Sequence, residues 1–563
     1  MKNILICIFI LTFTISLPHI SFAQENNKVG ISLLQPSSED IAQAAELINS
    51  NDGDWGYVTL VIQENDRDVR KWQDLFEQLR EKHLIPIVRL ATSPQGEVWR
   101  RPEENDAKEW ADFLNKLNWV IKKRYLVLFN EPNHASEWGG EVDPEGYAKV
   151  ADTFIKIIKE SNKDYIVMLA GMDAAAPSYP PQFEDSGIFI RKVFETKDTQ
   201  LKDGIDAWAS HSYPNPGFSG SVWDTNKKSI KGYEYELDLL QEMGVSKELP
   251  VFITETGWLE GKLSDNQIAE NNKIAFSEIW GIDGRIQAIT PFVFKYLSEP
   301  FKGFSWIHEE GFSQKYEVIK EIKKKKGEPD QIQEGSIHVS LPQTLIASSS
   351  YHFPLTIKNS GQAIWSSEDG YILSFKSSSE EVKTLISPIQ KIKPFEESQF
   401  FINIQTPTKP QTIKVSLSLK KGKERVIYTK EHSIVIEPLP HLTIKTSLFP
   451  KLLSQAEGFE VQLFNKQEEL IYSKKGISMR KGVVEVDRLT DIIPGEVYRV
   501  VLIGYPYIPR QEITTISKGK NYVKLKQLLP FDANGNGRLD WGDVLEAIKH
   551  PSFLLRFVPW NQL

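Results

Sequence analysis

The sequence predicts an α/β fold, a (β/α)8 TIM barrel over residues 24–325, followed by two all-β modules. Eight short runs rich in β-branched and aromatic residues alternate with amphipathic stretches in the first part of the chain. Beyond it the helical period ends, and alternating strands at short spacing take over. Eight strand–helix repeats over about 300 residues match the size of such a barrel. A doubly wound open sheet is the alternative, but no glycine-rich phosphate turn follows the first run.

The barrel elements follow from these runs in chain order. We expect its strands at 29–34, 57–62, 84–90, 125–129, 165–170, 205–211, 250–254 and 289–294. Apolar residues recur three and four apart in the expected helices, which are 38–49, 68–83, 107–123 and 144–160. Ser38 and Asp143 precede acidic residues, which makes both of them expected helix starts.

The second half of the chain is expected to hold three further parts. Residues 323–331 (KKKKGEPDQ) are charged and contain a proline, and we interpret them as a linker. A first β-sandwich spans 326–438 and resembles immunoglobulin-like modules of extracellular enzymes. A second small sandwich, 439–527, resembles a prealbumin-like module. Spacer or wall-tethering roles are expected for both, and residues 528–563 hold an acidic loop and a short helix.

Composition excludes some classes of function. Hydrophobic residues make up 40% and charged residues 25% of the chain, which excludes a mostly disordered protein. The net charge is -8 and no basic block is present, so nucleic acid is not expected as a partner. The 14 tryptophans are compatible with sugar binding and equally with core packing.

The first residues resemble an export signal. Lys2 precedes an apolar run over 4–17, and Ala23 ends a small-residue cleavage site, so 1–23 is the expected signal peptide. An uncleaved membrane anchor is the alternative, but the run is shorter than a spanning helix needs. Cys7 is the only cysteine and a poor lipoprotein site. We expect a secreted or cell-surface protein without disulfides and without a transmembrane segment in the mature chain.

Two glutamates end expected barrel strands. Glu131 lies in Asn130-Glu131-Pro132 after the fourth strand, and Glu255 lies in Thr254-Glu255-Thr256-Gly257-Trp258 at the seventh. Active sites of such barrels form at the carboxyl ends of the strands. Two carboxylates at opposite strand mouths can flank a single bond, as retaining glycoside hydrolysis requires.

With these two motifs, the barrel resembles clan A of the glycoside hydrolases. The resemblance covers about residues 28–325 and implies Glu131 as general acid/base and Glu255 as nucleophile. It also implies that Asn130 binds the sugar 2-hydroxyl and that Tyr213 serves the nucleophile. Glu131 must then carry a proton in the resting enzyme, while Glu255 stays ionised and needs hydrogen-bond donors.

Other side chains near the strand ends are candidates for substrate binding. His211 and Tyr213 are two apart, hence on one face of their strand, where they could reach Glu255. Arg89 near the end of strand three is either a cationic support or a rim ion pair, and the family more often carries its arginine on strand two. Tryptophans after strands four, seven and eight could stack on sugars: Trp138, Trp258 and Trp306. The resemblance favours Trp306 for the cleaved sugar.

The acidic loop near the C-terminus follows the calcium-loop pattern. The expected ligands are Asp532, Asn534, Asn536, the carbonyl of Arg538, Asp540 and Asp543. Gly537 falls where the loop turns sharply. Aspartate at the last position resembles a dockerin repeat, but dockerins carry two loops and one is found here. A structural calcium ion is therefore expected, and a cohesin-like or cell-wall partner is a weaker expectation.

Together these features predict a secreted retaining glycoside hydrolase acting on a poly- or oligosaccharide, with no cofactor for catalysis. Two rivals stay open at this point. One is a non-catalytic glycan-binding or adhesion protein on a glycosidase-like barrel. The other is a transglycosylase that uses the same site. The sugar, the linkage and endo or exo action depend on loop geometry, which the sequence does not specify.

Overall fold

The computed structural model describes residues 26–449 and 455–551. The chain divides into two compact units, Met1–Ile332 and Gln333–Leu563. The export signal expected over 1–23 lies outside the described residues.

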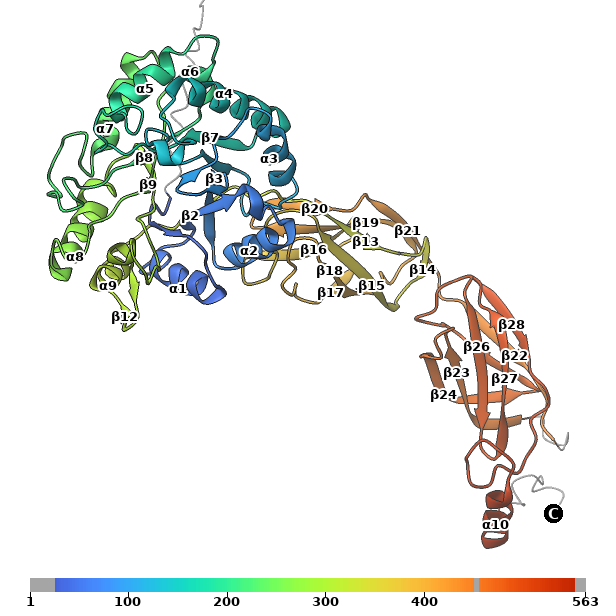
Figure 1. The fold of residues 1–563 in the computed structure, drawn as a ribbon. Helices are drawn as coiled ribbons and strands as arrows, with labels where there is room; N and C mark the ends of the chain where they lie inside the picture. The colour runs from blue at the N-terminus through green and yellow to red at the C-terminus, as the bar shows by residue number, and fades with distance from the viewer. Residues whose placement is uncertain (1–25, 450–454, 552–563) are drawn as a thin grey trace, which may run out of the picture. The chain divides into compact units, whose positions relative to one another are not determined.

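Unit 1 contains eight parallel strands in the predicted order (Figure 1). They are β1 (Gly30–Leu33), β2 (Gly56–Gln63), β3 (Leu84–Ala91), β6 (Arg124–Leu128), β7 (Tyr165–Leu169), β8 (Trp208–His211), β9 (Val251–Glu255) and β10 (Ile286–Ile289). Five of these strands form one sheet in the order β1-β2-β3-β6-β7, and the other three form a second sheet in the order β10-β9-β8. A parallel bridge between Val29 and Ile289 joins them at one seam. At the other seam the Asp206 N–H donates to the Val167 carbonyl at 3.0 Å, which completes a barrel-like ring.

Helices alternate with these strands. They are α1 (Ser38–Ile48), α2 (Val69–Glu81), α3 (Asp106–Leu114), α4 (Pro144–Ser161), α5 (Ser186–Glu195), α6 (Leu201–Gly204), α7 (Gly232–Glu242), α8 (Asp265–Ile274) and α9 (Gln314–Glu321). Asp143 caps α4 as expected, whereas α1 is capped by Ser37 rather than Ser38. The helix expected over 107–123 ends at Leu114, because Trp119 is buried in the following loop and donates its indole N–H to the Leu114 carbonyl.

The segment expected to be a linker packs against unit 1. Lys324 is buried and donates from Nζ to Ser50 Oγ at 2.8 Å and to the Ile319 carbonyl at 2.7 Å. Burial lowers the pKa of Lys324 to about 8. The Gly327 N–H donates to the Asp54 carbonyl at 2.9 Å. The predicted break therefore belongs to the body of unit 1 over most of its length.

Unit 2 begins with two antiparallel-rich sheets that enclose one apolar core. The first sheet contains β13 (Gly335–Val339), β15 (Ser350–Asn359), β17 (Lys383–Ile386) and β18 (Glu397–Gln405). The second contains β14 (Thr344–Ile346), β16 (Tyr371–Ser377), β19 (Gln411–Lys421), β20 (Glu424–Tyr428) and β21 (His432–Glu437). Alternating burial along β15 and β19 matches the period-two pattern that predicts a sandwich.

The following strands form one continuous seven-stranded sheet around a separate core, which gives the predicted second β module a sandwich- or barrel-like form. They are β22 (His441–Lys445), β23 (Gln455–Phe464), β24 (Leu470–Arg480), β25 (Val483–Val486), β26 (Val497–Gly504), β27 (Tyr507–Thr515) and β28 (Lys520–Lys524). The short ladder between β24 and β25 joins what would otherwise be separate halves. Helix α10 (Trp541–Lys549) follows the acidic loop. Across the described ranges, no helix combines the length and apolar character needed to cross a bilayer.

Candidate active site

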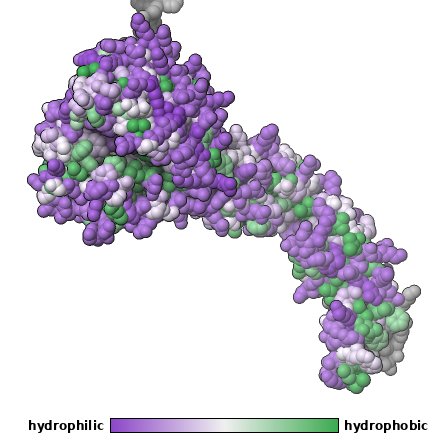
Figure 2. Space-filling view, in the orientation of Figure 1, coloured by the Kyte–Doolittle hydropathy of each residue, from purple (hydrophilic) through white to green (hydrophobic). Residues whose placement is uncertain are grey.

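A cleft of about 1320 Å³ opens at the carboxyl ends of the barrel strands. Figure 2 shows a hollow in the face of unit 1, with hydrophilic and hydrophobic residues mixed around it. Arg89 enters the cleft from β3, Glu131 from the loop after β6, and Glu255 from the last position of β9. Parallel strands direct their carboxyl ends to one face, so residues distant in sequence meet there.

The two glutamates lie side by side. A carboxylate oxygen of Glu131, one of Glu255 and a ring nitrogen of His211 all fall within 4.8 Å of one another. In retaining glycosidases the two carboxyl groups are about 5–5.5 Å apart, whereas inverting enzymes need about 6.5–9.5 Å to admit a water. The spacing thus suits direct attack by one carboxylate on a bond that the other protonates.

Hydrogen-bond donors surround Glu255. Arg89 Nη1 donates to Glu255 Oε1, and the Tyr213 hydroxyl donates to Oε2 at 3.0 Å. Burial acts to raise the pKa of Glu255, but the charges of His211 and Arg89 and these hydrogen bonds outweigh it and lower the pKa. Glu255 is therefore held ionised although it is buried.

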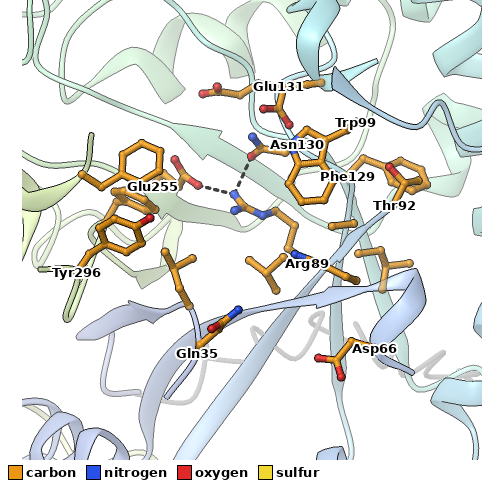
Figure 3. A pocket seen from close by; sticks show the side chains of 18 of the residues that line it. Gln35, Asp66, Arg89, Thr92, Trp99, Phe129, Asn130, Glu131, Glu255 and Tyr296 are labelled. Carbon is orange, nitrogen blue, oxygen red and sulfur yellow. Dashed lines mark hydrogen bonds and ion pairs between the residues drawn. The ribbon is translucent and has the colours of Figure 1, made fainter. Parts of the chain in front are cut away.

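Arg89 also fixes the side chain of Asn130. The same Nη1 donates to Asn130 Oδ1 at 2.7 Å, and Figure 3 shows the guanidinium between Glu255 and Asn130. Arg89 is thus buried within the site rather than paired at the barrel rim. Because its acceptor oxygen faces Arg89, the Asn130 amide presents its N–H groups in other directions.

His211 lies beneath the two carboxylates. Its Nδ1 bonds Glu131 Oε1 at 2.8 Å and lies 3.8 Å from Glu255 Oε2. A register shift in the β8–β9 ladder pairs His211 with Glu255. A Cβ atom at Gly171 would lie 2.2 Å from His211 Cδ2, so only glycine leaves room for the ring. His211 reaches both carboxylates as expected, but its side chain is 0% exposed and does not line the cleft, so it supports the two glutamates and does not face a substrate.

The backbone around Glu131 is strained. Phe129 has φ 72° and Glu131 has φ 32°, both in the left-handed region that favours glycine. Such strain persists only where the surrounding structure holds it, and it is concentrated at functional sites. Here it directs the Glu131 side chain into the cleft at the end of a buried strand.

The cluster of Glu131, His211 and Glu255 has the residue types of a metal site. The Arg89 guanidinium, however, already pairs with Glu255 Oε1, and the Tyr213 hydroxyl donates to Oε2, the oxygen on the side of His211. Both oxygens of Glu255 therefore already have partners within the protein.

The three tryptophans expected to stack on sugars do not line the cleft. Trp138 is buried against Phe129 and Tyr147, with ring centroids 5.9 and 5.2 Å away. Trp258 is buried and donates its indole N–H to the Gly220 carbonyl at 2.9 Å. Trp306 is buried in the core of unit 1. These predictions are wrong, because large apolar rings after a strand also serve to close the barrel core.

Other aromatic rings line the cleft instead, and sequence analysis missed them. They are Trp72, Trp99, Phe129, Phe218, Phe292, Tyr296, Phe301 and Phe304. Phe292, Phe301 and Phe304 lie in the loop after β10, where Phe292 packs edge-on against both other rings. Trp99 lies in a hairpin formed by β4 (Pro94–Gln95) and β5 (Val98–Trp99). The sequence signal for them was only that aromatic residues follow several of the barrel strands.

Tyr213→Phe tests the electrostatics of Glu255. The variant removes one donor to a buried carboxylate, a hydrogen bond of about 1.5–3 kcal/mol, so the pKa of Glu255 should rise by roughly one to two pH units. If Glu255 acts as a nucleophile, it must be ionised, and the acidic limb of the kcat/KM profile of Tyr213→Phe should then move to higher pH. An acidic limb that stays in place would show that Tyr213 does not tune Glu255.

The predicted calcium loop is ordered around its acidic residues. Asp543 Oδ1 accepts from the N–H groups of Ala533 and Asn534 at 2.9 and 3.2 Å, and its Oδ2 accepts from Asp540 at 2.8 Å. Asp532 is buried, its Oδ2 accepts from Gly537 at 3.0 Å, and its Oδ1 has no hydrogen-bond partner. Burial, and then the charge of Asp543, raise the pKa of Asp532. An orphaned buried oxygen beside a second carboxylate fits a cation.

No protein-family model and no curated protein matches the chain. Solved structures resemble it weakly. A family 128 (subgroup II) endo-β-1,3-glucanase from Pseudomonas viridiflava is 14% identical with a TM-score of 0.34, covering 53% of this chain and 98% of its own. A family 5 subfamily 18 protein from Streptomyces cattleya, solved with GlcNAc, is 13% identical with a TM-score of 0.40, covering 53% and 80%. A family 51 α-L-arabinofuranosidase from Bifidobacterium longum is 10% identical with a TM-score of 0.37, covering 68% and 96%.

Proposed function

We propose that unit 1 is a retaining glycoside hydrolase that cleaves O-glycosidic bonds of a poly- or oligosaccharide. The observation that carries the proposal is the pairing of Glu131 and Glu255 in one cleft, with carboxylate oxygens within 4.8 Å. That spacing is below the roughly 6.5–9.5 Å at which inverting enzymes hold a water beside the anomeric carbon, and so favours a covalent intermediate.

Glu131 is the general acid/base in this proposal. Its Oε1 bonds His211, which leaves Oε2 to carry the proton that the departing sugar oxygen takes. After the leaving group departs, the same carboxylate takes a proton from water, and the resulting nucleophile attacks the anomeric carbon.

Glu255 is the nucleophile. Its lowered pKa keeps it ionised, and Arg89 and Tyr213 hold both oxygens in place. Attack forms a glycosyl ester as the bond to the leaving oxygen breaks, and water then cleaves the ester with a second inversion. In the role implied by the resemblance, Asn130 donates to the substituent at C2 as positive charge builds on the anomeric carbon.

A panel of polysaccharides tests the proposal. Purified full-length protein should release reducing sugars from at least one of them, and the product sizes should distinguish endo from exo action. A protein that binds a glycan of the panel but cleaves none would support the glycan-binding alternative instead. If sugar acceptors outcompete water, the protein is a transglycosylase on the same site.

We further propose that the loop 532–543 binds one structural calcium ion. Asp532, Asn534, Asn536, the Arg538 carbonyl, Asp540 and Asp543 would supply its oxygens, and the orphaned Asp532 Oδ1 supports this assignment. The ion would order the loop before α10 and has no part in bond cleavage.

Calcium removal should destabilise unit 2. At 100 times Kd, a bound ion adds about 2.7 kcal/mol to the free energy of unfolding, so chelation should lower the melting temperature. Calorimetric titration should give one site that Asp532→Asn abolishes and that Asp487→Asn, at an exposed aspartate of unit 2, leaves intact. If calcium and chelator leave both the heat and the melting temperature unchanged, the assignment fails.

Three expectations remain predictions. They are export through residues 1–23, a cohesin-like or cell-wall partner for the C-terminal segment, and spacer roles for the β modules.

A further inference from the structure

A third carboxyl group lines the cleft, and the proposed reaction does not use it. Glu137 ends the short 3-10 helix η2 (Ala135–Glu137), in the loop that Glu131 begins. Its carboxylate accepts a hydrogen bond from the Asn130 side chain, whose oxygen is turned toward Arg89. Glu137 therefore lies on the donor side of the Asn130 amide, next to the position where a sugar would be cleaved.

Glu137 has no cationic partner. Among the residues that the structure describes, no lysine, arginine or histidine nitrogen lies within 4.0 Å of its carboxylate. Burial, and then repulsion by Glu131, raise the pKa of Glu137 to about 6. At neutral pH the group is thus mostly ionised beside a second carboxyl, a position that a bound cation would stabilise.

The lysine and arginine side chains that line the cleft form ion pairs with carboxylates other than Glu137. Arg89 pairs with Glu255, and Lys71 pairs with Asp66. Lys295 pairs with Asp40 at 3.2 Å.

The nearest imidazole is also engaged. His134 also lines the cleft, and its Nε2 bonds Asp173 Oδ2 at 2.8 Å. Arg89 acts on Glu137 only through its charge, without an ion pair, so the carboxylate is open to a direct cationic contact from a ligand in the cleft. The group that gives a sugar a positive charge is the ammonium of an amino sugar with a free amine.

We propose that Glu137 is a specificity-determining residue that binds the ammonium group of an amino sugar, so that the cleft prefers glycans with free amines. The inference rests on the proposed function in taking the ligand to be a sugar and in placing its C2 substituent beside Asn130. If Asn130 meets the substituent at C2, its neighbour Glu137 is placed to meet an amine at the same carbon.

Binding of non-hydrolysable sugars tests this without requiring turnover. The probes are methyl 1-thio-β-glycosides of glucosamine, galactosamine and mannosamine, each with its N-acetylated and its 2-hydroxy counterpart. Ligand-detected NMR at pH 7 with the full chain gives Kd for each probe. At least one amine should bind about tenfold more tightly than both counterparts, the size of one charge-assisted hydrogen bond.

Glu137→Gln should reduce this preference to about twofold or less, because the neutral amide keeps hydrogen bonding but loses the charge. Glu141→Gln is the matched control, because Glu141 is exposed, pairs with Arg101 at 3.7 Å and lies outside the cleft. It should keep the full preference.

Three results would overturn the proposal: no preference for amines in the parent protein, a preference that survives Glu137→Gln, or no binding of any amino sugar. Equal weakening of all probes by Glu137→Gln would also overturn it and would make Glu137 a positioning residue for Asn130. Failure of the proposed hydrolysis is read separately, from the polysaccharide panel.

Discussion

Glu255→Gln should abolish hydrolysis, lowering kcat by at least about ten-thousand-fold on every substrate that the parent cleaves. The amide is a poor nucleophile, so the covalent intermediate cannot form. When catalytic groups act as a unit, an enzyme that lacks one of them loses nearly all of its activity. The measurement is kcat and KM of both proteins on the best polysaccharide of the panel.

The variant needs a check on folding, because it leaves buried Arg89 without its carboxylate partner. Removing one member of a buried ion pair costs about 3–5 kcal/mol, so a thermal melt must accompany the kinetics. Glu255→Asp keeps the charge but withdraws it from the anomeric carbon, and it should also be strongly impaired. Glu270→Gln on the exposed face of α8 is the control. Near-parental activity of folded Glu255→Gln would exclude Glu255 as nucleophile.

Glu131→Gln should lower kcat on natural glycans by about 10²–10⁴-fold, the usual contribution of a general acid/base. The loss should depend on the leaving group. An aryl glycoside with a strongly acidic phenol needs no protonation to depart, so formation of the glycosyl-enzyme should be slowed much less. The measurement is the pre-steady-state burst of phenol against the steady-state rate.

A second readout of this variant is rescue by azide. A small anion can replace the deprotonated water in the second step, so azide should accelerate turnover of the aryl glycoside by the Glu131 variant and not by the parent. Equal losses on natural and activated substrates, without rescue, would contradict the role of Glu131 as acid/base.

Sequence patterns predicted the barrel strands and the glutamates that end two of them, because these features depend on the residues of short segments. Buried parallel strands need continuous apolar runs, so a glutamate that ends such a run stands out, as Glu131 and Glu255 do. Because strand order in the barrel follows the chain, these two ends could be placed on one face. The family resemblance, not a strand pattern, pointed to Tyr213 as the partner of Glu255, and its hydroxyl donates to Glu255 Oε2 at 3.0 Å.

Features that depend on packing between distant loops were missed. An indole after a strand has the same apolar character whether it closes the core, as Trp138 does, or lines the cleft, as Trp99 does. No sequence pattern pointed to Glu137, because the orientation of its side chain depends on the turn of η2 and on its contact with Asn130. The continuous sheet of the second β module depends on the β24–β25 pairing, which no periodicity encodes.

The most direct measurement is the anomeric configuration of the first product, followed by proton NMR in the first minutes before mutarotation. The geometry predicts that the anomer of the cleaved bond is retained, because Glu131 and Glu255 are closer than the carboxyl groups of inverting enzymes, which must also hold the attacking water. An inverted first product would show that water attacks directly, and would contradict the assignment of Glu255 as nucleophile.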